Sequence, residues 1–234
     1  MRLDKFLKEN GICTRSESKK ILKNGLVKVN GIVIKNSDYK VDENKDEIVF
    51  NGNLIKYEQF VYIMINKPAG YLSATEDRNQ KTILDLIPEY NYKNLFPFGR
   101  LDKDSVGLLI ISNDGALAHE LLSPKKHVDK KYYLRIKGKL AASDVEKFNK
   151  GITLEDGYVC KSAKLEILSS SDISECYVTI SEGKFHQLKR MFKMIEKEVV
   201  YLKRISFGKI NLDENLKEGE YRLLSEEEVK ILKS

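Results

Sequence analysis

The stretch FGRLDKDSVGLLIISNDG, residues 98–115, places four charged side chains directly ahead of an apolar run. The run 107–111 is short and rich in Leu and Ile, and the turn signal Asn-Asp-Gly follows it, which predicts a buried strand. An ionised carboxylate at the entrance to a core is costly unless a cation or water lies beside it. Asp102 and Asp104 therefore indicate either a turn that is open to water or a functional site.

The composition is that of a globular chain. Its 234 residues are 41% hydrophobic and 32% charged, which suits one large domain or two smaller ones. The longest apolar runs, 60–65 and 107–111, are far shorter than the roughly 20 residues of a membrane helix. The first residues mix charged and apolar side chains and do not resemble a secretory signal. We expect a cytoplasmic protein that does not bind membranes.

The cysteines and histidines are scattered. Cys13, Cys160 and Cys176 share no short spacing, and the three histidines form no H-E-x-x-H pattern. This argues against a disulfide framework or a zinc site. No G-x-S-x-G motif is present either, so serine-hydrolase chemistry is not expected. The sequence predicts no metal site.

Positive charge is concentrated near the start of the chain. The formal net charge is +6, and residues 1–28 hold eight Lys and Arg against three acidic residues, a balance of +5. Clustered cations suit a phosphate backbone, because each neutralised phosphate releases condensed counterions. A solvated helical face would have the same composition.

The same region predicts a compact helix-helix-hairpin module. Residues 3–12 carry apolar side chains at near-helical spacing, and Thr14–Glu17 has the sequence of a capping box that opens a second helix. Two β-branched runs flank Asn30 and Gly31, the strongest short signal for a hairpin. Charged, turn-rich sequence then leads to a boundary near residues 57–59.

The rest of the chain alternates strand and helix signals. Helix 143–151 is expected to begin with a Ser143–Glu146 capping box, and helix 116–122 to stop at Ser123-Pro124. Successive strands often lack the long crossover helix that a parallel pair needs. We therefore predict an α+β fold with a mixed, largely antiparallel sheet and flanking helices. The expected strands are 60–65, 107–112, 131–138, 162–168, 175–181 and 199–205, and the other expected helices are 185–196 and 225–232.

The first module resembles the small RNA-binding domain first seen in ribosomal protein S-four. The features that carry the resemblance are RLDKFL, RSESKKILKNG and VKVNGIVI, within residues 1–50. In that family the two basic helices contact structured RNA, and we expect this domain to span residues 1–57. The resemblance implies RNA contacts by Arg2, Lys5, Arg15, Lys19 and Lys20.

Residues 99–109 resemble the signature of pseudouridine synthases that modify ribosomal RNA: Gly-Arg-Leu-Asp, two residues, Ser or Thr, one residue, Gly-Leu-Leu. Ser105 stands where Thr is usual and keeps the hydroxyl group. On spacing alone, the same sequence fits a charged turn ahead of a buried strand. The resemblance implies a pseudouridine synthase catalytic domain over residues 58–234. Further blocks in family-like order are NKPAGYLSATED (66–77), KKYYLRI (130–136), SEGKFHQLKRMF (181–192) and VVYLKRISFGKI (199–210).

The resemblance implies three catalytic residues. The reaction breaks the bond from ribose to a ring nitrogen of uracil and rejoins the base through carbon, with no net redox change, so no cofactor is implied. Asp102 would be the carboxylate that acts as nucleophile or as base toward the sugar. Lys189 would hold it ionised. Tyr132 would stack on the uracil, with Tyr133 as a packing neighbour.

Further residues are expected to contact RNA around this site. In the predicted helix 185–196, apolar side chains share one face, while His186, Lys189 and Arg190 fall on another. A uridine in folded RNA must leave its stack, so contacts are needed to offset that cost. The expected RNA contacts are Arg100, His186, Gln187 and Arg190.

The closest resemblance is to the family called ribosomal small subunit pseudouridine synthase A, which modifies a uridine of 16S rRNA. The S-four-type domain, the phrase EGKFHQLKRMF and an end soon after EGEYRLLSEEEV point there. The expected partner is 16S rRNA or a small-subunit assembly intermediate, and the protein is expected to act as a monomer. Two alternatives stay open, a 23S rRNA pseudouridine synthase and a non-catalytic rRNA-binding or ribosome-assembly factor. Asp102, Tyr132 and Lys189 together argue against the second.

Overall fold

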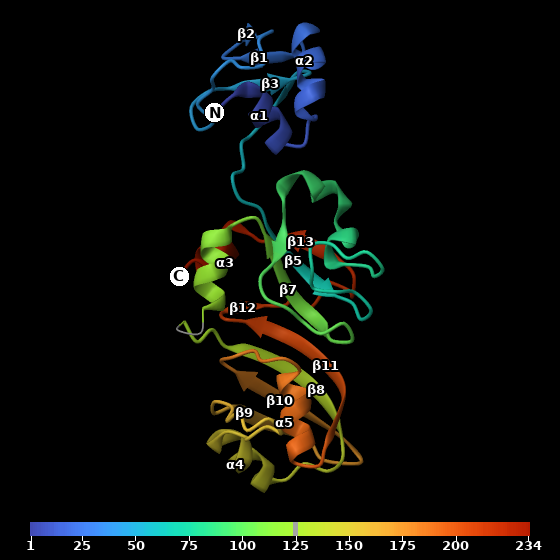
Figure 1. The fold of residues 1–234 in the computed structure, drawn as a ribbon. Helices are drawn as coiled ribbons and strands as arrows, with labels where there is room; N and C mark the ends of the chain where they lie inside the picture. Colours follow the sequence, from blue (N-terminus) through green and yellow to red (C-terminus); the bar gives the residue numbers. More distant parts are fainter. Residues whose placement is uncertain (124–125) are drawn as a thin grey trace. The chain divides into compact units, whose positions relative to one another are not determined.

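A computed structural model describes residues 1–123 and 126–234, which form two compact units. The first unit comprises Met1–Val61 and Ile87–Leu95, and the second comprises Tyr62–Leu86 and Phe96–Ser234 (Figure 1). Each unit combines helices with its own sheet, which confirms the α+β class. Within the described ranges, no helix is long and apolar enough to cross a membrane.

Two short helices open the first unit, α1 (Leu3–Glu9) and α2 (Arg15–Lys23). The predicted capping box is confirmed. The Thr14 hydroxyl accepts a hydrogen bond from the Glu17 N–H at 3.3 Å, and the Glu17 carboxylate accepts one from the Thr14 N–H at 2.8 Å. Two otherwise unpaired backbone donors are thereby satisfied, which fixes the start of the basic helix α2.

The sheet of the first unit has four strands in the order β2-β1-β3-β4, all antiparallel. The predicted hairpin turn at Asn30 and Gly31 is confirmed, since both have positive φ, 51° and 79°. A second hairpin was not predicted, although the same dipeptide, Asn51-Gly52, makes its turn with φ values of 47° and 83°. The strands are β1 (Val27–Val29), β2 (Ile32–Val33), β3 (Ile48–Phe50) and β4 (Asn53–Leu54).

Apolar side chains from both helices and from this sheet form the core of the first unit. The short 3-10 helix η2 (Pro88–Lys93) also belongs to this unit, although it lies far along the chain. Buried at the centre are Leu3, Phe6, Leu7, Leu22, Val27, Val29, Val41 and Ile48. The basic side chains of α1 and α2 are thus left on the outside.

The second unit is built on a nine-stranded sheet with the main order β13-β5-β7-β11-β8-β10-β9. Strands β11 and β7 pair in parallel, and the other pairs are antiparallel, so the predicted mixed, largely antiparallel sheet is confirmed. The strands are β5 (Tyr62–Lys67), β6 (Phe96–Pro97), β7 (Val106–Ser112), β8 (Lys130–Lys137), β9 (Lys164–Ser169), β10 (Ile173–Ile180), β11 (Glu198–Phe207), β12 (Ile210–Asn211) and β13 (Tyr221–Leu223).

Helices flank this sheet as expected, but the start of α4 differs from the prediction. Helix α4 (Ala142–Lys150) begins before the predicted Ser143–Glu146 capping box, and that prediction is wrong. The Asp144 carboxylate instead accepts a hydrogen bond from the Ala141 N–H at 3.0 Å, one residue ahead of the helix. Helix α6 (Glu226–Leu232) has a complete capping box between Ser225 and Glu228.

Helix α3 (Gly115–Leu122) ends as predicted, with Ser123 as its C-cap, whereas Pro124 of the predicted stop lies outside the described residues. The 3-10 helix η1 covers Ile83–Leu86. Helix α5 (Gln187–Met194) is shorter at both ends than the predicted 185–196. It begins after His186 because that residue has a left-handed backbone, with φ of 48°.

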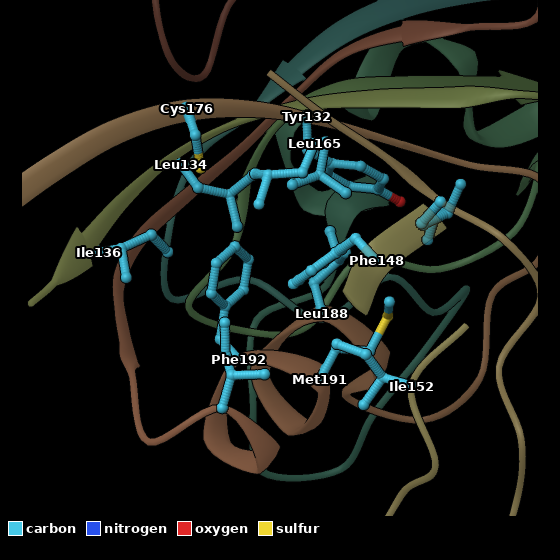
Figure 2. Close-up of a cluster of buried hydrophobic side chains, with 14 of the residues drawn as sticks. Tyr132, Leu134, Ile136, Phe148, Ile152, Leu165, Cys176, Leu188, Met191 and Phe192 are labelled. Carbon is cyan, nitrogen blue, oxygen red and sulfur yellow. The ribbon is translucent and has the colours of Figure 1, made fainter. Parts of the chain in front are cut away.

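The apolar face of α5 packs on the sheet and anchors the helix. Leu188, Met191 and Phe192 are buried against β8 and against Phe148 of α4 (Figure 2). The Phe148 and Phe192 ring centroids are 4.9 Å apart. Because the apolar face is fixed in this way, the polar residues of α5 hold defined positions on its other side.

Strand β7 follows the charged stretch and enters the core. One glycine in β7 allows the parallel strand β11 to approach closely. Gly107 has φ of 103° and lies opposite Arg204 of β11. A Cβ atom built at Gly107 would be 2.3 Å from the Arg204 carbonyl oxygen. Only glycine fits there, so this residue of the motif is explained by packing.

Candidate active site

Asp102 lies in the loop that joins β6 to β7, at the end of the sheet where β7 begins. The loop closes on itself, because the Ser105 N–H donates to the Asp102 carbonyl at 3.1 Å. The Asp102 side chain is 27% exposed. Asp102 is therefore partly exposed, and its side chain lines a cavity.

Lys67, at the end of β5, clamps this loop from below. Its side chain is fully buried, and the ammonium donates to the carbonyl oxygens of Pro68 (3.0 Å), Lys103 (3.2 Å) and Ser105 (2.8 Å). Burial lowers the pKa of Lys67 to about 8, while the nearby carboxylates of Asp104 and Asp102 oppose that change. A cation with three backbone acceptors thus fixes the turn that carries the aspartates.

The segment that follows β5 holds the loop at two more points. The Gly70 N–H donates to the Lys103 carbonyl at 2.7 Å. The buried Ser73 hydroxyl donates to the Leu101 carbonyl at 2.9 Å and accepts from the Leu101 N–H at 3.0 Å. The block 66–77 therefore positions Asp102 by holding the backbone of its two neighbours, Leu101 and Lys103.

Lys189 of α5 reaches the loop and bridges two carboxylates. Its Nζ lies 3.2 Å from Asp102 Oδ2 and 2.6 Å from Asp104 Oδ1. Desolvation lowers the pKa of Lys189, but the hydrogen bond to Asp104 and the charge of Asp102 outweigh it and leave the pKa raised. The same ammonium lowers the pKa of Asp104. Lys189 is therefore charged at neutral pH and shared by both aspartates.

The loop ahead of α5 places an aromatic pair at the mouth of the site. The Phe185 ring stacks on the His186 imidazole with centroids 3.8 Å apart and planes at 17°. His186 Nε2 is 3.6 Å from Asp102 Oδ1, and Phe185 is 77% exposed. A large exposed aromatic ring of this kind is suited to stacking on a planar ligand such as a nucleobase.

Tyr132 of β8 lines the same cavity as Asp102 and Lys189. It is 7% exposed and belongs to the core cluster, and it shares a cavity of about 70 Å³ with Asp102. Figure 2 shows its ring among the apolar side chains of that cluster. Tyr133 faces the other side of the sheet, where its ring makes edge contacts with Tyr177 and Tyr201.

Strand β11 supplies the remaining wall. Leu202 is 8% exposed and lines the same cavity as Asp102. Arg204 is 2% exposed, and its Nε donates to the Leu108 carbonyl at 2.7 Å. That bond ties β11 to β7 one residue after Gly107, at the parallel pairing.

Two residues predicted to contact RNA, Gln187 and Arg190, are engaged by other side chains of the protein. Gln187 is 4% exposed, and its amide donates to Glu182 at 2.6 Å and accepts from the Lys184 N–H at 2.9 Å. Arg190 binds Glu155 at 2.9 Å and Asp156 at 2.6 Å. Gln187 thereby holds residues 182–184 beside α5, and Arg190 holds residues 155–156 there.

Arg100 is exposed and lines the cavity that contains Asp102, and its contact with RNA stays a prediction. The five predicted residues of the first unit differ among themselves. Arg2 binds Asp4 at 2.8 Å, and Lys5 lies 3.5 Å from Glu9. Arg15, Lys19 and Lys20 of α2 are exposed, and no acidic partner within ion-pair distance is seen for them in the described ranges. These three form the free basic face of α2.

The site can hold a carboxylate ionised beside a cation, with an aromatic ring and a hydrophobic wall around a small planar ligand. Among residues 1–123 and 126–234, no cluster of His, Cys, Asp or Glu could bind a metal ion. Sequence reasoning missed Asp104, Lys67 and Ser73. Asp104 lies two residues after Asp102 in the stretch 98–115, and Lys67 and Ser73 lie in the motif 66–77. The motifs therefore contain these residues, but the sequence does not indicate their contacts.

Comparison with known proteins matches both regions of the chain. The family described as RNA pseudouridylate synthase matches residues 61–194, and the S4 domain matches residues 1–48. An uncharacterised RNA pseudouridine synthase of Bacillus subtilis is 47% identical over 99% of this chain and 98% of its own length. A ribosomal small subunit pseudouridine synthase A of Vibrio cholerae is 40% identical over 98% of each chain. A crystal structure of a pseudouridylate synthase, 37% identical, covers 99% of both chains with a TM-score of 0.70.

Proposed function

The chain belongs to the RNA pseudouridylate synthase family, and on that premise we propose that its substrate is a uridine of 16S ribosomal RNA. The chain is an RNA pseudouridine synthase, an isomerase, with an S4 domain. The 16S assignment is supported by relatives named ribosomal small subunit pseudouridine synthase A, at 40% identity in Vibrio cholerae and 37% in Haemophilus influenzae, each matched over nearly its whole length.

Asp102 is the catalytic carboxylate in this proposal. Isomerisation breaks the bond between ribose C1′ and uracil N1, forms one between C1′ and C5, and moves the C5 proton to solvent while N1 takes one up. The atoms of the nucleotide are unchanged, so the reaction needs neither a redox cofactor nor a group donor, and solvent exchanges the two protons. Asp102 acts either as a nucleophile at C1′ or as a base toward the sugar.

Lys189 keeps this carboxylate charged when RNA closes the cavity. Excluding water would otherwise raise the pKa of a carboxyl group and favour its neutral form. The ammonium lies 3.2 Å from Asp102 Oδ2 and opposes that change. The same electrostatic attraction strengthens as RNA displaces water, because the local dielectric constant falls.

Tyr132 and Arg100 receive the flipped nucleotide. Turning a uridine out of its stack costs a few kcal/mol, which stacking and phosphate contacts must offset. Tyr132 provides a ring within the cavity, and the exposed guanidinium of Arg100 stands at its edge. His186 completes the rim through its contact with Asp102.

The S4 domain, proposed as residues 1–57, holds the RNA while the catalytic domain, residues 58–234, performs the reaction. Its most available cations are Arg15, Lys19 and Lys20 on α2. Contacts of this kind are to phosphate and fix the register of the RNA without reading its sequence. The partner is 16S rRNA or a small-subunit assembly intermediate, and the protein acts as a monomer.

The experiment that tests the substrate is pseudouridine mapping. Purified protein is incubated with unmodified 16S rRNA, with 23S rRNA and with partly assembled small subunits, and each RNA is sequenced for new pseudouridine. One new site in 16S rRNA, free or assembled, is expected. A site in 23S rRNA alone would replace the proposal with a large-subunit assignment.

A further inference from the structure

A second cavity, of about 270 Å³, adjoins the site around Asp102 and is rich in cations. It is formed where the end of α3, the start of β8 and the end of β11 meet (Figure 1). Tyr132 and Arg100 line both cavities, so the two are neighbours across these side chains. The charged residues of its lining are Arg100, Lys130, Lys161, Glu182, Lys184 and Arg204.

Arg204 brings a permanent charge into this cavity. The residue is 2% exposed, and its Nε donates to the Leu108 carbonyl. In the part of the chain that the structure describes, its two terminal nitrogens have no acceptor and no carboxylate within ion-pair distance. A buried guanidinium normally has an anionic partner, because an unpaired buried charge is costly.

Lys130 adds a second cation beside the first. Its Nζ donates to the Val128 carbonyl at 2.6 Å and, within the described ranges, has no carboxylate in ion-pair distance. Its ammonium and the Arg204 guanidinium each lie 5.6 Å from the centroid of the same Phe207 ring. Burial, followed by repulsion from Arg204, lowers the pKa of Lys130 to about 8, against the pull of Asp129 and Glu182.

The one carboxylate of the lining, Glu182, is already occupied. It accepts hydrogen bonds from the Tyr158 hydroxyl at 2.7 Å, from the Lys161 N–H at 3.0 Å and from the Gln187 amide at 2.6 Å. Its oxygens are therefore occupied by these donors, and within the described residues it lies beyond ion-pair distance of both Arg204 and Lys130. Two mutually repelling cations in a cavity without a free acid form a prepared anion site.

We propose that this cavity binds a phosphodiester of the substrate RNA next to the target uridine, held by Lys130 and Arg204. An arginine can bind phosphate with two parallel hydrogen bonds, and a lysine adds a point charge. The position beside Tyr132 lets one nucleotide occupy the cavity of Asp102 while its neighbouring phosphate is held here. The inference rests on the RNA synthase activity of the chain and is independent of which ribosomal subunit it modifies.

The test compares Lys130→Met with Lys131→Met. Lys131 is the next residue of β8, and its side chain lies on the opposite face, over the Tyr177 ring and 3.8 Å from Glu166. Dissociation constants are measured at several salt concentrations for an RNA fragment that contains the mapped uridine. For Lys130→Met we expect affinity to fall about tenfold and the slope of log K against log salt to decrease by about 0.7 to 0.9, the value of one phosphate contact. Lys131→Met should keep the wild-type slope.

A second arm locates the phosphate. Each phosphodiester near the target uridine is replaced in turn by an uncharged methylphosphonate. At one position the wild-type enzyme should lose about tenfold in affinity while Lys130→Met loses no more, because the contact is already absent. The proposal would be overturned if every methylphosphonate reduced the affinity of wild type and of Lys130→Met by the same factor and Lys130→Met kept the wild-type salt slope.

Thermal unfolding separates this role from a structural one. Removing a cation that Arg204 repels should leave the melting temperature of Lys130→Met equal to or above that of wild type. A lower melting temperature with unchanged RNA affinity would make Lys130 a structural residue and contradict the proposal. If mapping finds the uridine in 23S rRNA, the fragment is taken from there. If no rRNA is modified, the salt slope is measured on total rRNA, and an unaltered slope for Lys130→Met again overturns it.

Discussion

At the scale of single residues, the site is organised by two lysines that bind one loop, one through its carboxylates and the other through its backbone. Lys189 reaches the carboxylates of Asp102 and Asp104 from α5. Lys67 binds three carbonyl oxygens of the backbone beneath them. One lysine lies within ion-pair distance of Asp102, and the other holds the backbone of its loop, so their substitutions should have different consequences.

Substitution of Lys189 should impair the chemical step more than RNA binding. In Lys189→Met the cation that opposes desolvation of Asp102 is lost, and we expect the single-turnover rate at saturating enzyme to fall at least about 100-fold. Lys189→Arg should recover part of that rate, since it keeps the charge. Asp104→Asn, which removes the competing carboxylate, is the matched control and should change the rate less than about tenfold. An Asp104→Asn effect as large as that of Lys189→Met would show that the two aspartates have been assigned the wrong way round.

Lys67 should leave a signature in the pH dependence of stability. Its folded pKa of about 8 lies below its ordinary value of 10.5, so between these values the unfolded chain holds a proton that the folded chain has released. The free energy of unfolding contributed by this group therefore rises with pH across that window, by at most about 1.4 kcal/mol per pH unit, and is constant below it.

Urea unfolding of wild type and Lys67→Met between pH 7 and pH 10 measures this contribution. The difference in free energy of unfolding, wild type minus variant, should increase above pH 8. A difference that stays flat or declines would mean that Lys67 is not desolvated as its burial indicates. Turnover by Lys67→Met should also fall, because the loop of Asp102 loses the hydrogen bonds from this ammonium to the Lys103 and Ser105 carbonyls.

At the scale of elements, the site depends on how closely β7 and β11 approach. Strand β7 follows the loop of Asp102, β11 carries Leu202 and Arg204, and these strands are the one parallel pair of the sheet in the described part of the chain. Helix α5 adds Lys189 because its apolar face is fixed by Leu188, Met191 and Phe192. A change at the strand pairing should therefore disturb catalysis and stability together.

Gly107→Ala tests that pairing. A Cβ atom there would meet the Arg204 backbone at 2.3 Å, where no flexible side chain can yield. We expect a loss of stability of about 2 to 4 kcal/mol, seen as a lower melting temperature. Gly115→Ala, at the first residue of α3 with nothing within 4 Å, should be neutral or slightly stabilising. Equal melting temperatures for the two variants would contradict the close approach.

The outline of these elements could be predicted from the sequence, whereas several of their ends could not. Capping boxes and the Asn30-Gly31 turn are local, so α2 and the first hairpin were predicted correctly. The second hairpin was missed because its acidic surroundings suggested a loop. The start of α4 was misplaced because Ser143 offers the usual capping residue, while Asp144 makes the actual contact. Asp102 and Lys189 were identified by resemblance, but the clamp by Lys67 depends on tertiary contacts that no local pattern contains.

At the scale of the whole molecule, the proposed function divides the work between a region that holds RNA and a region that changes it. The S4 domain matches residues 1–48, and the synthase family matches residues 61–194. Charge follows this division, because residues 1–28 hold most of the net positive charge. Binding and chemistry should therefore respond to different substitutions.

The triple substitution Arg15→Gln, Lys19→Gln and Lys20→Gln should weaken binding without slowing the reaction of bound RNA. Three lost phosphate contacts would reduce the slope of log K against log salt by about 2 to 3. Lys150→Gln at the end of α4 provides the surface control and should leave the slope unchanged. A wild-type slope for the triple variant would remove this face of α2 from the RNA interface.

The central claim is that Asp102, kept ionised by Lys189, performs the isomerisation. Its most direct test is a single-turnover assay of Asp102→Asn at saturating enzyme, with pseudouridine counted in the RNA. The account predicts RNA affinity within a few fold of wild type and pseudouridine formation slowed on the order of 10³-fold or more. Formation at the wild-type rate would contradict it.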